Sequence, residues 1–85
     1  DRLRAYPSPA SSALTLEFYL QYPESVLVQI FSIKGQCISE YSAPSARPGL
    51  NTLILDIDEM GIPKGIYMIK ISGKNHSKAI RTTII

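Results

Sequence analysis

The feature that most constrains this chain is a series of short runs in which apolar and polar residues alternate, each bounded by glycine or proline. Residues 13–20 are the clearest case, because an extended backbone would place every second side chain on one face. The apolar side chains of that face are Leu14, Leu16, Phe18 and Leu20. No segment has the three- and four-residue apolar spacing of an amphipathic helix. The pattern therefore predicts β-strands and no helix.

Alternation and turn residues predict six clear strands and one weak strand, spaced about 8–12 residues apart. The weak strand is residues 3–6, which Pro7 and Pro9 end. The clear strands are residues 13–20, 26–33, 36–42, 50–57, 65–72 and 77–85. Both faces of residues 26–33 carry apolar side chains, so we expect both to be partly covered. A regular series of this kind is typical of a two-sheet antiparallel β-sandwich.

The connections between the strands are predicted from glycine, proline and polar residues. Lys34-Gly35 is predicted to be a two-residue hairpin loop, in which Gly35 can adopt a positive φ. The other predicted connections are a turn at residues 22–25, a crossing loop at 43–49, a connection at 58–64 and a hairpin loop at 73–76.

The size and charge of the chain limit its function. A chain of 85 residues with no apolar run near the ~18–20 residues of a membrane span is expected to be one domain. Because it begins without Met or a signal peptide, we expect residues 1–85 to be a module excised from a longer protein. The net charge of +2 does not predict nucleic-acid binding.

The charges are unevenly distributed along the chain. All seven acidic residues lie at or before Glu59. The charged residues after it are all basic: Lys64, Lys70, Lys74, Lys78 and Arg81. The C-terminal hairpin is therefore expected to be basic. Its lysines could keep a sheet edge soluble, or they could dock an acidic partner.

Catalytic and metal-binding constellations are missing from the sequence. The only cysteine, Cys37, lies in a strand pattern and is expected to be a small buried apolar residue, and the only histidine, His76, falls in a turn. These two residues cannot supply the three or four ligands of a zinc site or a nucleophile with its base. The acidic residues of 56–59 lack the spacing of a calcium loop. We therefore predict no enzyme, no metal and no cofactor.

The tyrosines leave a second class of function open. Exposed coplanar rings, such as those of Tyr19 and Tyr22, could stack on sugars in a carbohydrate-binding or spacer module of an extracellular enzyme. The same residues could instead frame the core of a sandwich, with their hydroxyl groups in solvent. Loss of glycan binding on Tyr19→Ala or Tyr22→Ala would favour the first interpretation.

Two short signatures lie near the ends of the chain. The first is Tyr6-Pro7-Ser8-Pro9-Ala10-Ser11, followed by Leu14-Thr15-Leu16-Glu17-Phe18. The second is Gly65-Ile66-Tyr67, ahead of a final strand that contains Lys78-Ala79-Ile80-Arg81. In order and spacing, and with the Gly35 turn between them, they resemble the type A C-terminal sorting domain of the type IX secretion system of Bacteroidetes. Ser8 stands where that family usually has Asn, and residues 59–64 are a variant of its short connection.

The resemblance implies a fold and a function. The fold would be an all-β, immunoglobulin-like antiparallel β-sandwich of about seven strands. The function would be a secretion signal that guides an N-terminal cargo domain through the periplasm to the type IX translocon and its shuttle proteins. A cell-surface sortase would then cut near or upstream of Asp1, and the cargo would be anchored to lipopolysaccharide at the surface or released. The domain would be the substrate of the sortase.

The resemblance and the basic C-terminal pattern together predict where the translocon would bind. The predicted recognition residues are Gly65, Tyr67, Lys74, Lys78, Ala79, Ile80, Arg81, Ile84 and Ile85, and the family-motif residues are Tyr6, Pro7, Pro9, Ala10 and Gly35. The last strand is expected to offer a sheet edge, to which a partner could add a strand. A second copy could pair there as well and form a homodimer. Alternatively, this strand only completes the sandwich.

Overall fold

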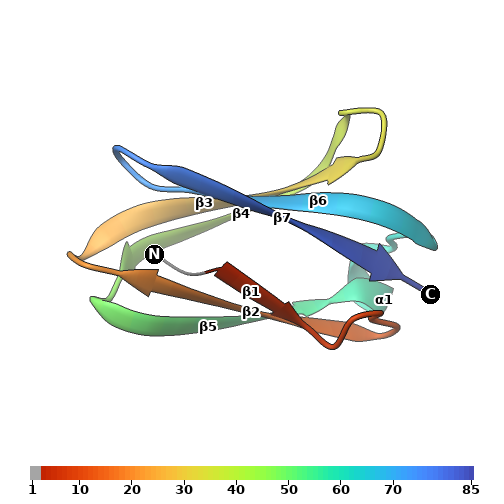
Figure 1. Ribbon diagram of the computed structural model, residues 1–85, viewed down its shortest axis with the longest axis horizontal. Helices are drawn as coiled ribbons and strands as arrows, with labels where there is room; N and C mark the ends of the chain where they lie inside the picture. Colours follow the sequence, from red (N-terminus) through yellow and green to blue (C-terminus); the bar gives the residue numbers. More distant parts are fainter. Residues whose placement is uncertain (1–2) are drawn as a thin grey trace.

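The computed structural model describes residues 3–85, which form two antiparallel sheets packed face to face (Figure 1). The elements are β1 (Leu3–Tyr6), β2 (Ala13–Leu20), β3 (Glu24–Ser32), β4 (Cys37–Ala46), β5 (Gly49–Asp56), α1 (Ile57–Met60), β6 (Gly65–Ser72) and β7 (Ser77–Ile84). One sheet has the order β1-β2-β5, and the other has the order β4-β3-β6-β7. The prediction of an all-β sandwich of about seven strands is confirmed.

The core lies between the sheets, where the alternating runs place it. The inward side chains of β2 are all at most 6% exposed, as predicted for Leu14, Leu16, Phe18 and Leu20. They pack against the inward side chains of β3 and β6, which are Val26, Val28, Ile30, Tyr67, Ile69 and Ile71. Since burial of one such side chain contributes about 1.5–3 kcal/mol, these three strands supply most of the hydrophobic stabilisation.

Two strands are longer than the sequence predicts. β3 begins at Glu24 rather than at residue 26, and β4 continues to Ala46 rather than ending at residue 42. The predicted crossing loop is therefore reduced to Arg47 and Pro48. The extension of β4 through position 44 is possible because β4 is an edge strand, where the missing N–H of a proline can face away from the sheet.

The predicted two-residue loop at Lys34-Gly35 is wrong. The loop has three residues, because the Ser32 N–H donates to the Gln36 carbonyl at 2.8 Å and the Gly35 N–H donates to the Ser32 carbonyl at 2.9 Å. Gly35 has a φ of +88°, the left-handed conformation that closes three-residue hairpin loops. Glycine is needed here as predicted, but for a different loop type.

The prediction of no helix is also wrong, although α1 is only four residues long. Asp56 caps it by accepting a hydrogen bond from the Glu59 N–H at 3.0 Å, and Gly61 ends it with a φ of +68°. A single capped turn is too short to show a helical stripe in the sequence. In the described part of the chain, no helix has the length and apolar character to cross a bilayer.

The outer face of the β4-β3-β6-β7 sheet bears on two predictions. We expected both faces of β3 to be partly covered; Leu27 and Phe31 on the outer face are half-buried, although none of the elements formed by residues 3–85 lies over this face (Figure 1). Cys37 was expected to be buried, but it is exposed, because it starts edge strand β4 on that open face opposite Phe31.

Candidate functional site

The β6–β7 hairpin carries all of the predicted recognition residues. The two strands pair without interruption from Gly65 opposite Ile84 to Ser72 opposite Ser77. The exposed members of the predicted set are Lys74, Lys78, Ala79, Arg81 and Ile85. Gly65 and Ile80 are half-buried, whereas Tyr67 and Ile84 are 5% and 3% exposed. The set therefore divides into surface residues and core residues.

The Gly65-Ile66-Tyr67 signature forms a local packing unit. The Tyr67 ring lies beside Gly65, where an added Cβ atom would sit 3.5 Å from a ring carbon. The Tyr67 hydroxyl donates to the Pro63 carbonyl at 2.6 Å. Tyr67 thus connects the start of β6 to the preceding connection, and its buried ring holds the hairpin against the core.

The N-terminal signature meets the end of β7. Ala10 forms a parallel bridge with Ile84: the Ala10 N–H donates to the Thr83 carbonyl at 2.9 Å, and the Ile85 N–H donates to the Ala10 carbonyl at 2.8 Å. The Ala10 side chain is fully buried. In Figure 1 the segment after β1 runs beside the end of β7. The sequence did not predict this contact, since a single alanine carries no pairing signal.

The Ala10 bridge corrects the expectation of an open edge along β7. The backbone of Thr83 points to Ala10, so the backbone groups of Ala79 and Arg81, at alternate positions, point the same way. No described residue outside β6 forms a backbone hydrogen bond with Ala79 or Arg81. Among the described residues, the first part of β7 therefore has no hydrogen-bonded neighbour other than β6, although β1 packs beside it, and its last residues are occupied.

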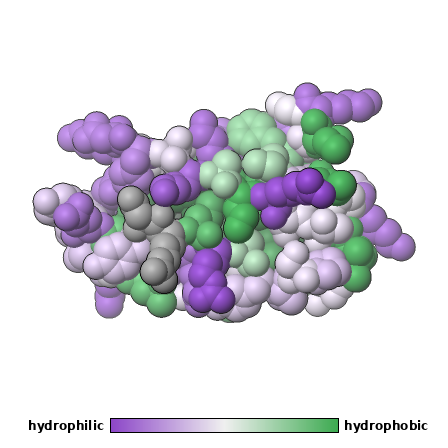
Figure 2. All heavy atoms as spheres, in the orientation of Figure 1, coloured by the Kyte–Doolittle hydropathy of each residue, from purple (hydrophilic) through white to green (hydrophobic). Residues whose placement is uncertain are grey.

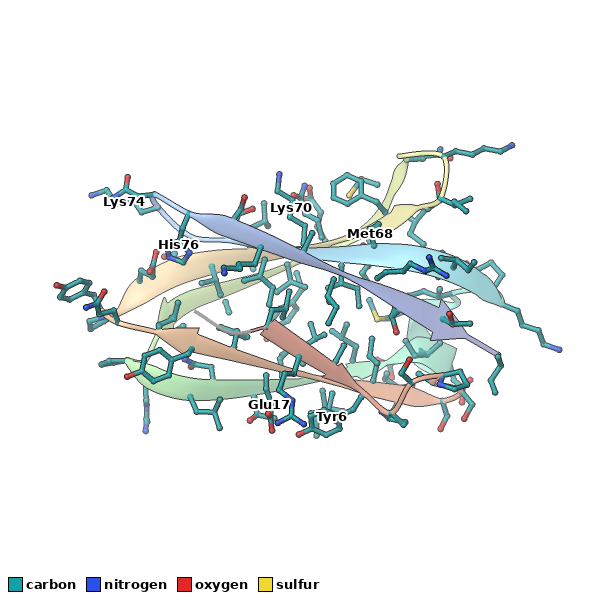
Figure 3. All side chains as sticks on the ribbon, viewed as in Figure 1. Tyr6, Glu17, Met68, Lys70, Lys74 and His76 are labelled. Atoms are coloured by element: carbon teal, nitrogen blue, oxygen red, sulfur yellow. The ribbon has the colours of Figure 1, made fainter. Side chains whose placement is uncertain are left out.

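The tyrosine of the first signature contacts the glutamate of the strand that follows. The Tyr6 hydroxyl donates to a Glu17 carboxylate oxygen, and a guanidinium nitrogen of Arg4 lies 3.6 Å from the other oxygen. The hydrogen bond to Glu17 is the main reason that the pKa of Tyr6 is raised. Figure 3 shows Tyr6 and Glu17 side by side on the outer side of the β1-β2-β5 sheet.

A second contact fastens the β6–β7 loop to the start of β3. Glu24 accepts from the Lys74 N–H at 2.8 Å, and its other oxygen lies 2.9 Å from His76 Nε2. The loop is closed by the Gly73 N–H, which donates to the His76 carbonyl at 2.8 Å. His76 is exposed as predicted, but its carboxylate partner lies 52 residues away and was not predicted.

Acid is expected to weaken this loop contact. The hydrogen bond to His76, and then that to the Lys74 N–H, hold the pKa of Glu24 below its ordinary value of 4.5. A lowered folded pKa means that Glu24 stabilises the fold above pH 4.5 and loses that contribution as the pH falls through the folded pKa. Urea unfolding followed between about pH 6 and pH 3 should therefore show a shallower pH dependence for Glu24→Gln than for the wild type. His76→Ala, which breaks the same contact from the other side, should reduce the dependence as well; an unchanged slope in both variants would contradict the prediction.

An open hollow of about 490 Å³ lies at the end of the sandwich that carries the β2–β3 and β6–β7 connections. Its lining includes the rings of Tyr19 and Tyr22, which are 51% and 68% exposed, together with Gln21 and Asn75. Elsewhere, no three His, Cys, Asp or Glu side chains among the described residues are grouped so that they could hold a metal ion. The tyrosine hollow thus combines exposed aromatic rings with amide side chains at one end of the sandwich.

The comparisons with known proteins decide the family. The family described as the secretion system C-terminal sorting domain matches residues 4–85. The chain belongs to this family. No curated protein matches the chain. The match extends through both signatures, so the Ala10 bridge joins the two ends of the sorting domain. The family is a non-catalytic secretion signal of the type IX secretion system, which implies export across the outer membrane to the cell surface or the medium.

Proposed function

We propose that residues 1–85 are the sorting domain of a longer secreted protein and that the β6–β7 hairpin is the part that the type IX translocon and its shuttle proteins bind. The observation that supports this best is the Ala10 bridge, because it brings the two family signatures together at one end of β7. A receptor that binds along β7 would therefore detect a folded domain rather than a short peptide.

The predicted recognition residues then have two roles. Lys74, Lys78 and Arg81 are exposed and would attract an acidic receptor, which mainly raises the association rate. The open backbone groups of Ala79 and Arg81 would pair with a receptor strand. Gly65, Tyr67 and Ile84 would act through the shape of the hairpin, and the other predicted residues, Ile80 and Ile85, would flank the contact.

Processing follows recognition in this proposal. The cargo domain is N-terminal to the sorting domain and passes with it through the periplasm. A surface sortase cuts near or upstream of Asp1, and the cargo is anchored to lipopolysaccharide or released. The isolated domain forms homodimers through an edge strand, most readily β4, whose ten-residue length has no partner on its outer side among the described residues.

A reporter fusion tests the proposed function. Residues 1–85 are placed behind a fluorescent protein that carries a signal peptide, in a host with a type IX system, and the fluorescence outside the outer membrane is measured. The wild-type fusion should reach the exterior, and Lys74→Glu with Lys78→Glu should retain it in the periplasm. The control is Arg47→Glu in the β4–β5 connection, which reverses one positive charge as each lysine substitution does, and it should be exported. Periplasmic retention of the wild-type fusion would refute the proposal.

The tyrosine hollow supports a second candidate function, a carbohydrate-binding module. Two exposed rings beside amide side chains are the groups that commonly bind sugars. On a glycan array, Tyr19→Ala and Tyr22→Ala should lose binding that the wild type shows. Tyr41→Ala, at a 47% exposed ring on β4, should retain it. Absence of glycan binding by the wild type would eliminate this candidate.

A further inference from the structure

We propose that the outer face of β3 and β6 is a docking surface for an acidic protein of the secretion machinery, adjacent to the edge of β7, with which it shares Arg81. The surface consists of an apolar patch, defined as Phe31, Ile33, Ile66 and Met68, with cationic residues at its border. The inference rests on the proposed function, because it assigns the partner to the same export pathway.

The strand register brings the apolar patch together. Phe31 lies opposite Met68, and Ile66 is the next outward residue of β6 toward the β3–β4 loop, where Ile33 is 74% exposed. The alternate residues Ile30, Tyr67 and Ile69 are buried in the core, so the patch residues point outward. Ile66 and Met68 are 37% and 38% exposed.

The apolar character of this face is unusual for a solvent-exposed sheet. The outward face of an antiparallel sheet in water is normally polar, so a phenylalanine, a methionine and isoleucines on one face need a reason. None of the elements formed by residues 3–85 covers it. In Figure 2, hydrophobic side chains reach the surface beside the β3–β4 loop, whereas hydrophilic side chains dominate at the β6–β7 loop. Exposed apolar clusters bordered by polar groups are typical of protein interfaces.

The charges around the apolar patch indicate the chemistry of the partner. Arg81 lies opposite Met68 on β7, Lys70 is the next outward residue of β6, and Lys34 is in the β3–β4 loop. None of the three forms an ion pair with a described residue. The carboxylate of Glu40, two strands from Lys70, accepts a hydrogen bond from Gln29 at 2.9 Å. Figure 3 shows Met68 and Lys70 on the outer side of the sheet.

These charges favour an acidic protein over the other possible occupants. A second copy would bring the two sets of Lys34, Lys70 and Arg81 into one interface, and like charges oppose association. Each basic residue near an anionic membrane contributes only about 1 kcal/mol to the binding free energy, so three cations would bind a membrane weakly. A protein with apolar side chains surrounded by carboxylates would satisfy both the apolar patch and its cationic border.

The reporter fusion described above can test this surface on its own. Ile66→Glu with Met68→Glu places charge on the apolar patch, and Lys34→Glu with Lys70→Glu reverses its border without removing apolar contacts. The apolar pair should reduce exported fluorescence at least about fivefold, the effect expected on loss of a central interface contact. The border pair should also reduce it, because the reversed charges slow association with an acidic partner. The control is Leu50→Glu with Ile54→Glu, at residues 65% and 67% exposed on the outer face of the opposite sheet, and it should be exported as the wild type is.

The outcomes separate this inference from the proposed function. If the wild type, the control and both patch pairs are exported equally, the docking surface is refuted and the secretion role stands. If the wild type is retained, both are refuted. Urea midpoints measured on the purified variants show whether either pair unfolds the domain. If the apolar pair does so, the border pair must by itself reduce the exported fluorescence for the proposal to stand. The wild type could instead co-sediment with phosphatidylglycerol vesicles, or form dimers, in a way that Ile66→Glu with Met68→Glu abolishes. The first result would assign the surface to a membrane and the second to another copy of the chain, and either would overturn the proposal.

Discussion

Replacement of Tyr67 by alanine is expected to lower the free energy of unfolding by about 3–5 kcal/mol, the cost of removing a buried aromatic side chain. The ring is 5% exposed and belongs to the core cluster. Its loss would also leave the Pro63 carbonyl without the hydroxyl that donates to it and would remove the ring that packs beside Gly65. Because small domains have a total stability of about 5–15 kcal/mol, the variant should be largely unfolded at mild urea concentrations.

The variant Tyr67→Phe separates the ring from its hydrogen bond. It keeps the packing and removes only the hydroxyl, so it should cost about 1 kcal/mol. Tyr41→Ala is a suitable control, since that ring is 47% exposed on edge strand β4. Urea unfolding monitored by circular dichroism gives all three values. Equal losses for Tyr67→Ala and Tyr67→Phe would show that the hydrogen bond, and not the ring, holds the hairpin.

Ala10→Asp is expected to be the second most damaging change, with a loss of about 3 kcal/mol or more, because it buries a carboxylate without a partner. The Ala10 side chain is fully buried in the core cluster, and its backbone carries both hydrogen bonds to the end of β7. The neutral acid is the form that the buried site favours, so the loss should be smaller at low pH.

Ser11→Asp is the matched control for Ala10→Asp. Ser11 is the next residue and is exposed, so the same charge there should change the unfolding free energy by less than about 0.5 kcal/mol. Hydrogen exchange adds a local measure, since the amide of Ile85, which donates to the Ala10 carbonyl, should lose protection in Ala10→Asp before the amides of β2 do. A wild-type urea midpoint for Ala10→Asp would mean that Ala10 is not part of the folded core.

The strands and the core were predictable from the sequence because they depend on a two-residue period. Leu14 and Leu16 show it on β2 and Ile69 and Ile71 show it on β6, and all four side chains are buried. A strand buried on one face and a strand buried on both faces have similar patterns when the second face also carries apolar residues. For that reason the side of Phe31 over which no element lies was predicted to be partly covered.

The long-range contacts at the candidate site could not be predicted. The Glu24–His76 contact joins residues 52 positions apart, and only the packing of β3 beside β6 brings them together. The Ala10 bridge depends on backbone groups alone, which are the same in every residue type. Proline at position 44 suggested a loop, whereas an edge strand tolerates it. The family resemblance drew attention to both signatures without showing that they touch.

The Ala10 bridge also has a mechanical consequence. If cargo is attached ahead of β1 and a receptor holds the end of β7, tension between them reaches two hydrogen bonds, to Thr83 and from Ile85, before it reaches the hydrophobic interior. The domain would then yield first at this junction, with the β2, β3 and β6 strands still packed. A pulling experiment between those two attachment points should register a small early rupture ahead of global unfolding.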